Sequence, residues 1–110
     1  MSLDVWLKDP TDPDGEDLYW RNITHNVGNM ANAAGLYEPL WRPDEMAVET
    51  AKELIAPIEV GLEMLRSDPG KFKALNPSNG WGSYEGLVAF AEDYLKACKE
   101  YPDGLVRVSR

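Results

Sequence analysis

Side chains that form directional hydrogen bonds recur at helical spacing between residues 22 and 32: Asn22, His25, Asn26, Asn29 and Asn32. Residues three or four positions apart share a helix face, so in a helix these groups form one polar stripe. Asn is a poor helix former because its amide competes for nearby backbone groups, and an ordinary solvated face carries Glu, Lys and Gln. The stripe therefore predicts a surface that hydrogen-bonds a ligand or a partner.

His25 is the single histidine of the chain. An imidazole near Asp17 and Arg21 could act as a general base at neutral pH. However, no Ser or Cys lies in a nucleophile motif, and the carboxylates lack a paired spacing. The residue types therefore favour a His25 that contacts a ligand or caps the core, while a small hydrolase or transferase that uses His25 is the alternative.

A second set of side chains combines aromatic rings with hydrogen-bond donors. Each Trp of this set has a purely structural interpretation, in which it fills a seam between loops and helices. In the functional interpretation, the set gathers beside the polar stripe and forms a concave site for a small polar ring, an anionic group or a protein segment. The resulting candidate binding residues are Asn22, His25, Asn26, Asn29, Trp41, Arg42, Asn79, Trp81 and Tyr84.

Metal and cofactor motifs fail when their spacing is tested. Asp12 and Asp14 have the spacing of calcium ligands, but the first ligand position would be Pro10 and the last Arg21. The glycines of residues 80–86 miss the dinucleotide-binding pattern by one position, and no strand is expected before them. One His and one Cys are too few for a structural zinc site. We therefore expect neither a metal nor a cofactor.

Charge and composition narrow the class of protein. The chain has 110 residues, of which 44% are hydrophobic, and this fits one domain over residues 1–110. Its formal net charge of -8 argues against nucleic-acid binding, which needs clustered Lys and Arg. Basic partners fit this charge better.

The compartment is predicted from Cys98 and from hydropathy. A single Cys cannot form an internal disulfide, and the helical pattern around Cys98 favours a buried apolar role over a reactive thiol. No apolar run approaches the roughly 20 residues of a membrane span, and the N-terminus lacks a signal-peptide pattern. We therefore expect a cytoplasmic protein that does not bind membranes.

Hydrophobic periodicity predicts the elements that would position these side chains. Apolar spacing predicts helices over residues 16–34, 43–66 and 84–100, with a kink or break near Pro57. Residues 4–7 and 105–109 are expected as short strands that pair. The expected fold is mainly α: a small single-domain bundle of three to four helices with a two-stranded pairing of the chain ends.

Several strings of the sequence are distinctive. They are Asn22–Asn26 (NITHN), Leu40–Pro43 (LWRP), Asn76–Pro77, Asn79–Gly82 (NGWG) and Tyr84–Leu87 (YEGL). Together they resemble strings of a family of short uncharacterised proteins encoded by phages and bacteria, over most of the chain. The resemblance implies a small intracellular accessory protein, with a host factor or a host small molecule as its partner. It assigns no catalytic residue.

The sequence as a whole predicts a small, non-catalytic binding protein whose partner is a small molecule or a protein. Besides the hydrolase or transferase that uses His25, a third hypothesis is a structural subunit whose Asn stripe is the interface of a homo-oligomer. A buried stripe would instead be an internal hydrogen-bonded network that fixes helix packing.

Overall fold

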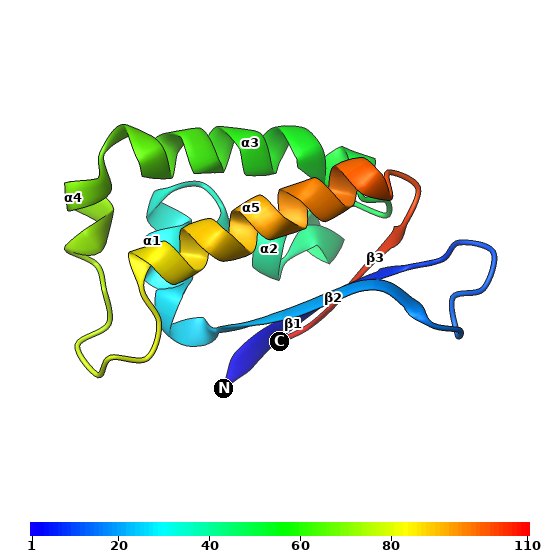
Figure 1. The fold of residues 1–110 in the computed structure, drawn as a ribbon, viewed down its shortest axis with the longest axis horizontal. Helices are drawn as coiled ribbons and strands as arrows, with labels where there is room; N and C mark the ends of the chain where they lie inside the picture. Colours follow the sequence, from blue (N-terminus) through cyan, green and yellow to red (C-terminus); the bar gives the residue numbers. More distant parts are fainter.

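The computed structural model describes residues 1–110 and combines a small sheet with helices (Figure 1). Its elements are β1 (Ser2–Lys8), β2 (Asp17–Thr24), the 3-10 turn η1 (His25–Val27), α1 (Gly28–Ala33), α2 (Tyr37–Trp41), the 3-10 turn η2 (Pro43–Met46), α3 (Lys52–Ser67), α4 (Pro69–Lys73), α5 (Tyr84–Glu100) and β3 (Leu105–Ser109).

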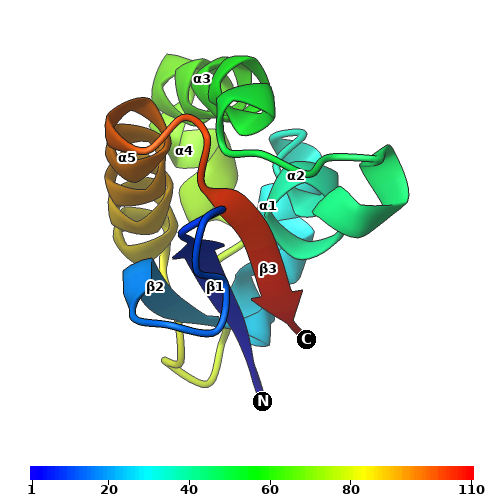
Figure 2. The same cartoon turned by 90° about the vertical axis from the view of Figure 1, so that its right-hand side faces the viewer.

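The three strands form one antiparallel sheet in the order β2-β1-β3. The central strand β1 alternates strictly: Leu3, Val5 and Leu7 are fully buried, while the residues between them are partly exposed. This period of two is typical of a strand with one buried face. The helices gather on one side of the sheet (Figures 1 and 2), so the buried face of β1 contacts them and the other face is open.

The predicted mainly helical bundle is wrong. The structure is 51% helical and 19% strand, with a three-stranded antiparallel sheet and five helices. The main error concerns the predicted helix 16–34, because residues 17–24 form β2 and α1 begins only at Gly28. In β2, Ile23 lies opposite Leu3 and Tyr19 lies opposite Leu7. Pairing with β1 therefore decides the conformation of a segment that is rich in aromatic and β-branched residues.

Other expectations about the elements agree better with the structure. The chain ends pair as predicted, with Val5 of β1 opposite Val108 of β3. Helix α5 begins after Ser83, whose Oγ accepts a hydrogen bond from the Gly86 N–H at 3.0 Å. The predicted helix 43–66 is partly wrong, because residues 43–46 form the separate turn η2 and α3 begins only at Lys52. Helix α3 then runs to Ser67 with Pro57 inside it, so the predicted break is absent.

One apolar core joins the sheet to the helices. It contains 25 buried hydrophobic residues, including Cys98, whose thiol has its pKa raised to about 12 by burial. A thiol with this pKa stays protonated and unreactive at neutral pH. Where α3 meets the start of α2, a Cβ on Gly61 would lie 2.3 Å from Leu36 Cδ2. Only glycine permits this close approach.

A polar contact fixes β2 against α5. The Tyr19 hydroxyl donates to Asp93 Oδ2 at 2.9 Å, and Arg21 Nη1 lies 3.0 Å from the same oxygen. Both contacts lower the pKa of Asp93, and the hydrogen bond from Tyr19 is the largest cause. The Tyr19 ring also stacks on Tyr94 at 5.6 Å between centroids. Strand β2 is therefore held to α5 by both a stacked ring pair and a charged group.

Removal of the hydroxyl should change the free energy of unfolding differently at two buried tyrosines. The Tyr94 hydroxyl is buried without a hydrogen-bond partner, so Tyr94→Phe should leave the free energy of unfolding unchanged or raise it by up to about 1 kcal/mol. The Tyr84 hydroxyl donates to the Leu65 carbonyl at 2.8 Å. A continuing helix would bond this carbonyl to the N–H of residue 69, which is Pro69 and has none.

Tyr84→Phe should therefore destabilise the protein by about 1–3 kcal/mol, because the Leu65 carbonyl is left unpaired. Urea unfolding of the two variants beside wild type measures both effects. A larger loss for Tyr94→Phe than for Tyr84→Phe would contradict this account of the core.

Candidate functional site

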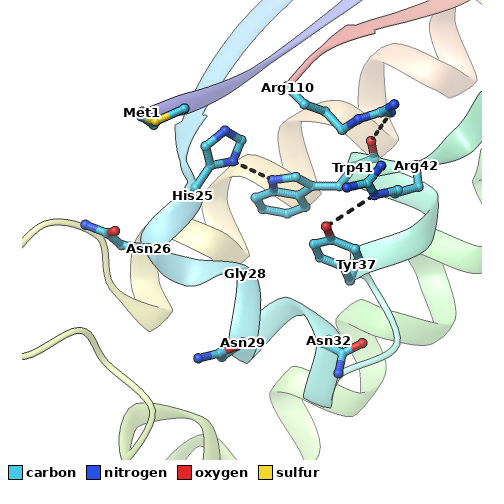
Figure 3. A pocket seen from close by; sticks show the side chains of 10 residues that line it. All are labelled: Met1, His25, Asn26, Gly28, Asn29, Asn32, Tyr37, Trp41, Arg42 and Arg110. Atoms are coloured by element: carbon cyan, nitrogen blue, oxygen red, sulfur yellow. Dashed lines mark hydrogen bonds between the residues drawn. The ribbon is translucent and has the colours of Figure 1, made fainter.

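A pocket of about 700 Å³ opens at the end of the sheet where β1 begins and β3 ends. Helices α1 and α2 form its other walls (Figure 3). Its lining residues come from four parts of the chain, residues 1, 25–32, 37–42 and 110: Met1, His25, Asn26, Gly28, Asn29, Asn32, Tyr37, Trp41, Arg42 and Arg110.

A hydrogen bond between two ring nitrogens fixes the centre of the pocket. Trp41 Nε1 donates to His25 Nδ1 at 2.8 Å. An indole N–H is only a donor, so Nδ1 of this imidazole must be unprotonated. The neutral ring then carries its proton on Nε2. His25 therefore presents an N–H donor on the edge of its ring that faces away from Trp41.

Aromatic rings form the wall behind this hydrogen bond. The rings of Tyr37 and Trp41 stack with 5.6 Å between centroids and an interplanar angle of 12°. These residues are four positions apart on α2, so they lie on one helix face. The Arg42 Nε donates to the Tyr37 hydroxyl at 3.3 Å. Tyr37 is thus held by Trp41 at its face and by Arg42 at its hydroxyl.

The two arginines of the pocket are paired with carboxylates outside it. Arg42 Nη1 lies 2.9 Å from Glu45 Oε2. Arg110 Nη1 lies 2.8 Å from Asp44 Oδ1 and donates to the Trp41 carbonyl at 2.9 Å. The hydrogen bond from Arg110 lowers the pKa of Asp44. Each guanidinium of the pocket therefore has a carboxylate counterion.

The open side of the pocket is lined by amides. Asn26, Asn29 and Asn32 are exposed, and their side chains form no hydrogen bond within the protein. Figure 3 shows the three amides spread along η1 and α1, with Gly28 between Asn26 and Tyr37. Each amide offers both a donor and an acceptor to a bound molecule.

The structure brings together five of the nine residues predicted for the site. His25, Asn26, Asn29, Trp41 and Arg42 all line the pocket. The run from His25 to Asn32 is helical as predicted, so its polar side chains lie near one another.

The other four predicted residues lie elsewhere. Asn22 is on β2 and donates to Asp4 Oδ1 at 2.9 Å on the open face of the sheet. Asn79 and Trp81 belong to the loop before α5, where Trp81 is exposed, and Tyr84 is buried in the core. The structure therefore does not gather Asn79, Trp81 and Tyr84 with Trp41 in this pocket, contrary to the expectation. Asn22 lies apart from the other amides because its segment forms β2 instead of a helix.

Sequence reasoning placed Asn32 in the polar stripe but not among the candidate binding residues, and it missed four lining residues altogether: Met1, Gly28, Tyr37 and Arg110. The spacing of four residues between Tyr37 and Trp41 was a usable signal, since such pairs share a helix face. Arg110 gave no local signal, because only the pairing of β3 with β1 brings it to the pocket.

Asp17 and Arg21, which were expected near His25, are paired with other residues. Asp17 pairs with Lys8, and Arg21 pairs with Asp93 on α5. The lining of the pocket contains no Ser, Thr, Cys, Asp or Glu that could serve as a nucleophile or orient the imidazole. The partner of His25 is instead the indole of Trp41.

The bond between Trp41 and His25 can be measured by a double-mutant cycle. Trp41→Phe keeps an aromatic ring for Tyr37 but removes the indole N–H, and His25→Ala removes the acceptor. Urea unfolding of both single variants and the double variant should give a coupling free energy of about 0.5–1.5 kcal/mol. Additive effects, with coupling below about 0.3 kcal/mol, would contradict the hydrogen bond.

Comparisons of this chain with protein-family models, with curated proteins and with solved structures found no match. The resemblance to short phage and bacterial proteins therefore stays a prediction. None of the helices combines the length and the apolar character that crossing a membrane requires. A function must therefore be inferred from the side chains that line the pocket.

Proposed function

We propose that this chain is a non-catalytic binding protein whose pocket holds a small, uncharged polar ring that carries hydrogen-bond acceptors. The observation that carries the proposal is the hydrogen bond from Trp41 to His25. It makes His25 a donor with a fixed tautomer, which suits recognition of a carbonyl oxygen or a ring nitrogen.

The composition of the lining supports this ligand class. Small-molecule sites combine aromatic walls with a few placed polar groups, and their volumes are about 300–1,000 Å³. This pocket has an aromatic wall of Tyr37 and Trp41 and free amides at Asn26, Asn29 and Asn32. Both arginines already have carboxylate partners, which favours an uncharged ligand over an anion.

Catalysis is the weaker hypothesis on the same geometry. A general base accepts a proton, yet the lone pair on His25 Nδ1 is occupied by the Trp41 N–H and Nε2 carries the ring proton. The pocket also has no nucleophile. The hydrolase or transferase alternative would need both groups to be supplied by the substrate or by another chain.

A substitution at Gly28, on the wall of the pocket, can change ligand binding without changing folding. Gly28 has helical backbone angles, with φ of -58°, and a Cβ there would lie 4.0 Å from Tyr37 Cε1. Gly28→Ala should therefore fold normally, with a free energy of unfolding unchanged or raised by about 0.5–1 kcal/mol. Its methyl group should occupy pocket volume and lower ligand retention.

Native mass spectrometry of gently purified protein measures retention, as the mass lost on denaturation. Wild type should carry a small-molecule mass that Gly28→Ala lacks. Gly70→Ala is the matched control, because Gly70 lies on α4 outside the pocket and its Cβ would only contact Asp68 at 3.9 Å. This control should retain the ligand.

Two outcomes would contradict the proposal. One is wild type without excess mass that also shows no shift of the Trp41 indole resonance on titration with uracil, adenine and nicotinamide. The other is a homo-oligomer that Gly28→Ala leaves intact and Asn26→Asp dissociates. That result would favour the structural-subunit hypothesis, because a new charge at a symmetric interface faces its own copy.

A further inference from the structure

The open face of the sheet carries a row of three large side chains that the pocket does not use. In the strand register, Trp20 of β2 lies opposite Trp6 of β1, which lies opposite Arg107 of β3. Trp20 is 55% exposed although it is a large aromatic residue. The helices lie on the other side of the sheet (Figure 2), and within the row Arg107 is exposed while Trp6 is partly buried.

Each of the two indoles contacts a charged side chain of β1. The Trp20 N–H donates to Asp4 Oδ1 at 3.2 Å, whereas the Lys8 ammonium lies 5.9 Å from the centroid of the Trp6 ring. Asp4 and Lys8 lie on opposite sides of Trp6 along β1, so the two indoles contact different charged neighbours. The face therefore offers two separate aromatic platforms, and at least Trp20 is fixed by a hydrogen bond.

Two hydrogen-bond donors beside the indoles remain able to bind another molecule. The Trp6 indole N–H forms no hydrogen bond within the protein, and Arg107 forms no ion pair. The one contact of the Arg107 guanidinium is to the Val106 carbonyl at 2.8 Å. Both groups are available to carbonyl oxygens of a bound chain.

The loop that joins β1 to β2 adds negative charge at one end of the face. Asp12, Asp14 and Glu16 are exposed and form no ion pair. This loop follows Lys8 and precedes Asp17, so it continues from the strands that carry the two indoles. A ligand that lies across both indoles and reaches this loop would meet uncompensated carboxylates, which favour Lys or Arg.

The size of the face decides between a globular and a linear occupant. Three strands about 4.8 Å apart and seven residues of about 3.3 Å each give an area of about 300 Å². A stable interface buries about 800 Å² on each partner. The flat footprint of the face is less than half of this value, so a second copy would need further contacts beyond the face. Its width fits an extended peptide.

We propose that this face binds a proline-rich peptide with basic residues at one end. A polyproline II helix presents a ring on a repeat of three residues and has no internal hydrogen bonds, so its carbonyls are free to accept from Trp6 and Arg107. Proline rings pack on indoles, as in other aromatic proline-recognition sites. The basic end of the peptide contacts the acidic loop between β1 and β2.

The test is titration of the full chain with a ten-proline peptide that carries two arginines at its N-terminus, followed by calorimetry. We expect saturable binding at 0.05 M salt that weakens as salt rises, since the charged contacts are exposed. Replacing the two arginines by glutamates should weaken binding at least about tenfold. Comparing the affinity of the original peptide with that of a peptide that carries the arginines at the C-terminus shows in which direction the peptide lies on the face.

Trp20→Thr should weaken binding of the arginine peptide at least about tenfold, because Trp contacts dominate interfaces of this kind. Thr is a good strand former, so β2 should persist, which circular dichroism checks. Trp81→Thr is the matched control: Trp81 is 71% exposed but lies on the loop before α5, and its replacement should leave the affinity unchanged.

Three results would overturn the proposal: no binding of the arginine peptide, equal binding of the glutamate peptide, or equal losses for Trp20→Thr and Trp81→Thr. Binding of a soluble β-linked glucose oligomer in place of the peptide would also overturn it and assign the face to carbohydrate. Self-association that Trp20→Thr abolishes would assign it to a second copy.

Discussion

The hydrogen bond between Trp41 and His25 is the interaction on which the pocket depends. Trp41 is 2% exposed, and a buried indole N–H without a partner costs free energy. His25 Nδ1 satisfies that N–H at 2.8 Å, and the same contact joins η1 to α2. One bond therefore sets the tautomer of the imidazole, the place of the aromatic wall and the distance between two walls of the pocket.

Residues at the ends of the strands hold both partners of this hydrogen bond in place. The backbone N–H of His25 donates to the Met1 carbonyl at 3.3 Å, and the Arg110 guanidinium donates to the Trp41 carbonyl at 2.9 Å. Both contacts come from the ends of strands, so the pairing of β1 with β2 and β3 fixes the outer rim of the pocket. Backbone pairing is a rigid support, because every ladder bond constrains its neighbours. The fold thus places the pocket where its strand ends meet its short helices.

The sequence could predict the elements whose signals are long and local. Helix α5 was recognisable from the Ser83 cap and its apolar stripe, and the terminal strands from alternation and turn residues. Strand β2 was missed because Trp20, Ile23 and Val27 also fit a helical period. Its conformation is decided by pairing with β1, which is not a local property. The sequence pattern grouped His25, Asn26 and Asn29 because they lie within one helical run. The position of Trp81 could not be predicted in this way, because it depends on the conformation of a loop, which has no periodic pattern.

The most direct test of the account is the protonation state of the His25 ring nitrogens at neutral pH. Long-range proton–nitrogen correlation spectra of the uniformly labelled protein distinguish the two neutral tautomers. The account predicts an unprotonated Nδ1, a protonated Nε2, and a Trp41 indole proton that exchanges with water more slowly than those of the exposed Trp20 and Trp81. A protonated Nδ1, or a Trp41 indole proton that exchanges as fast as the exposed ones, would contradict the hydrogen bond on which the pocket depends.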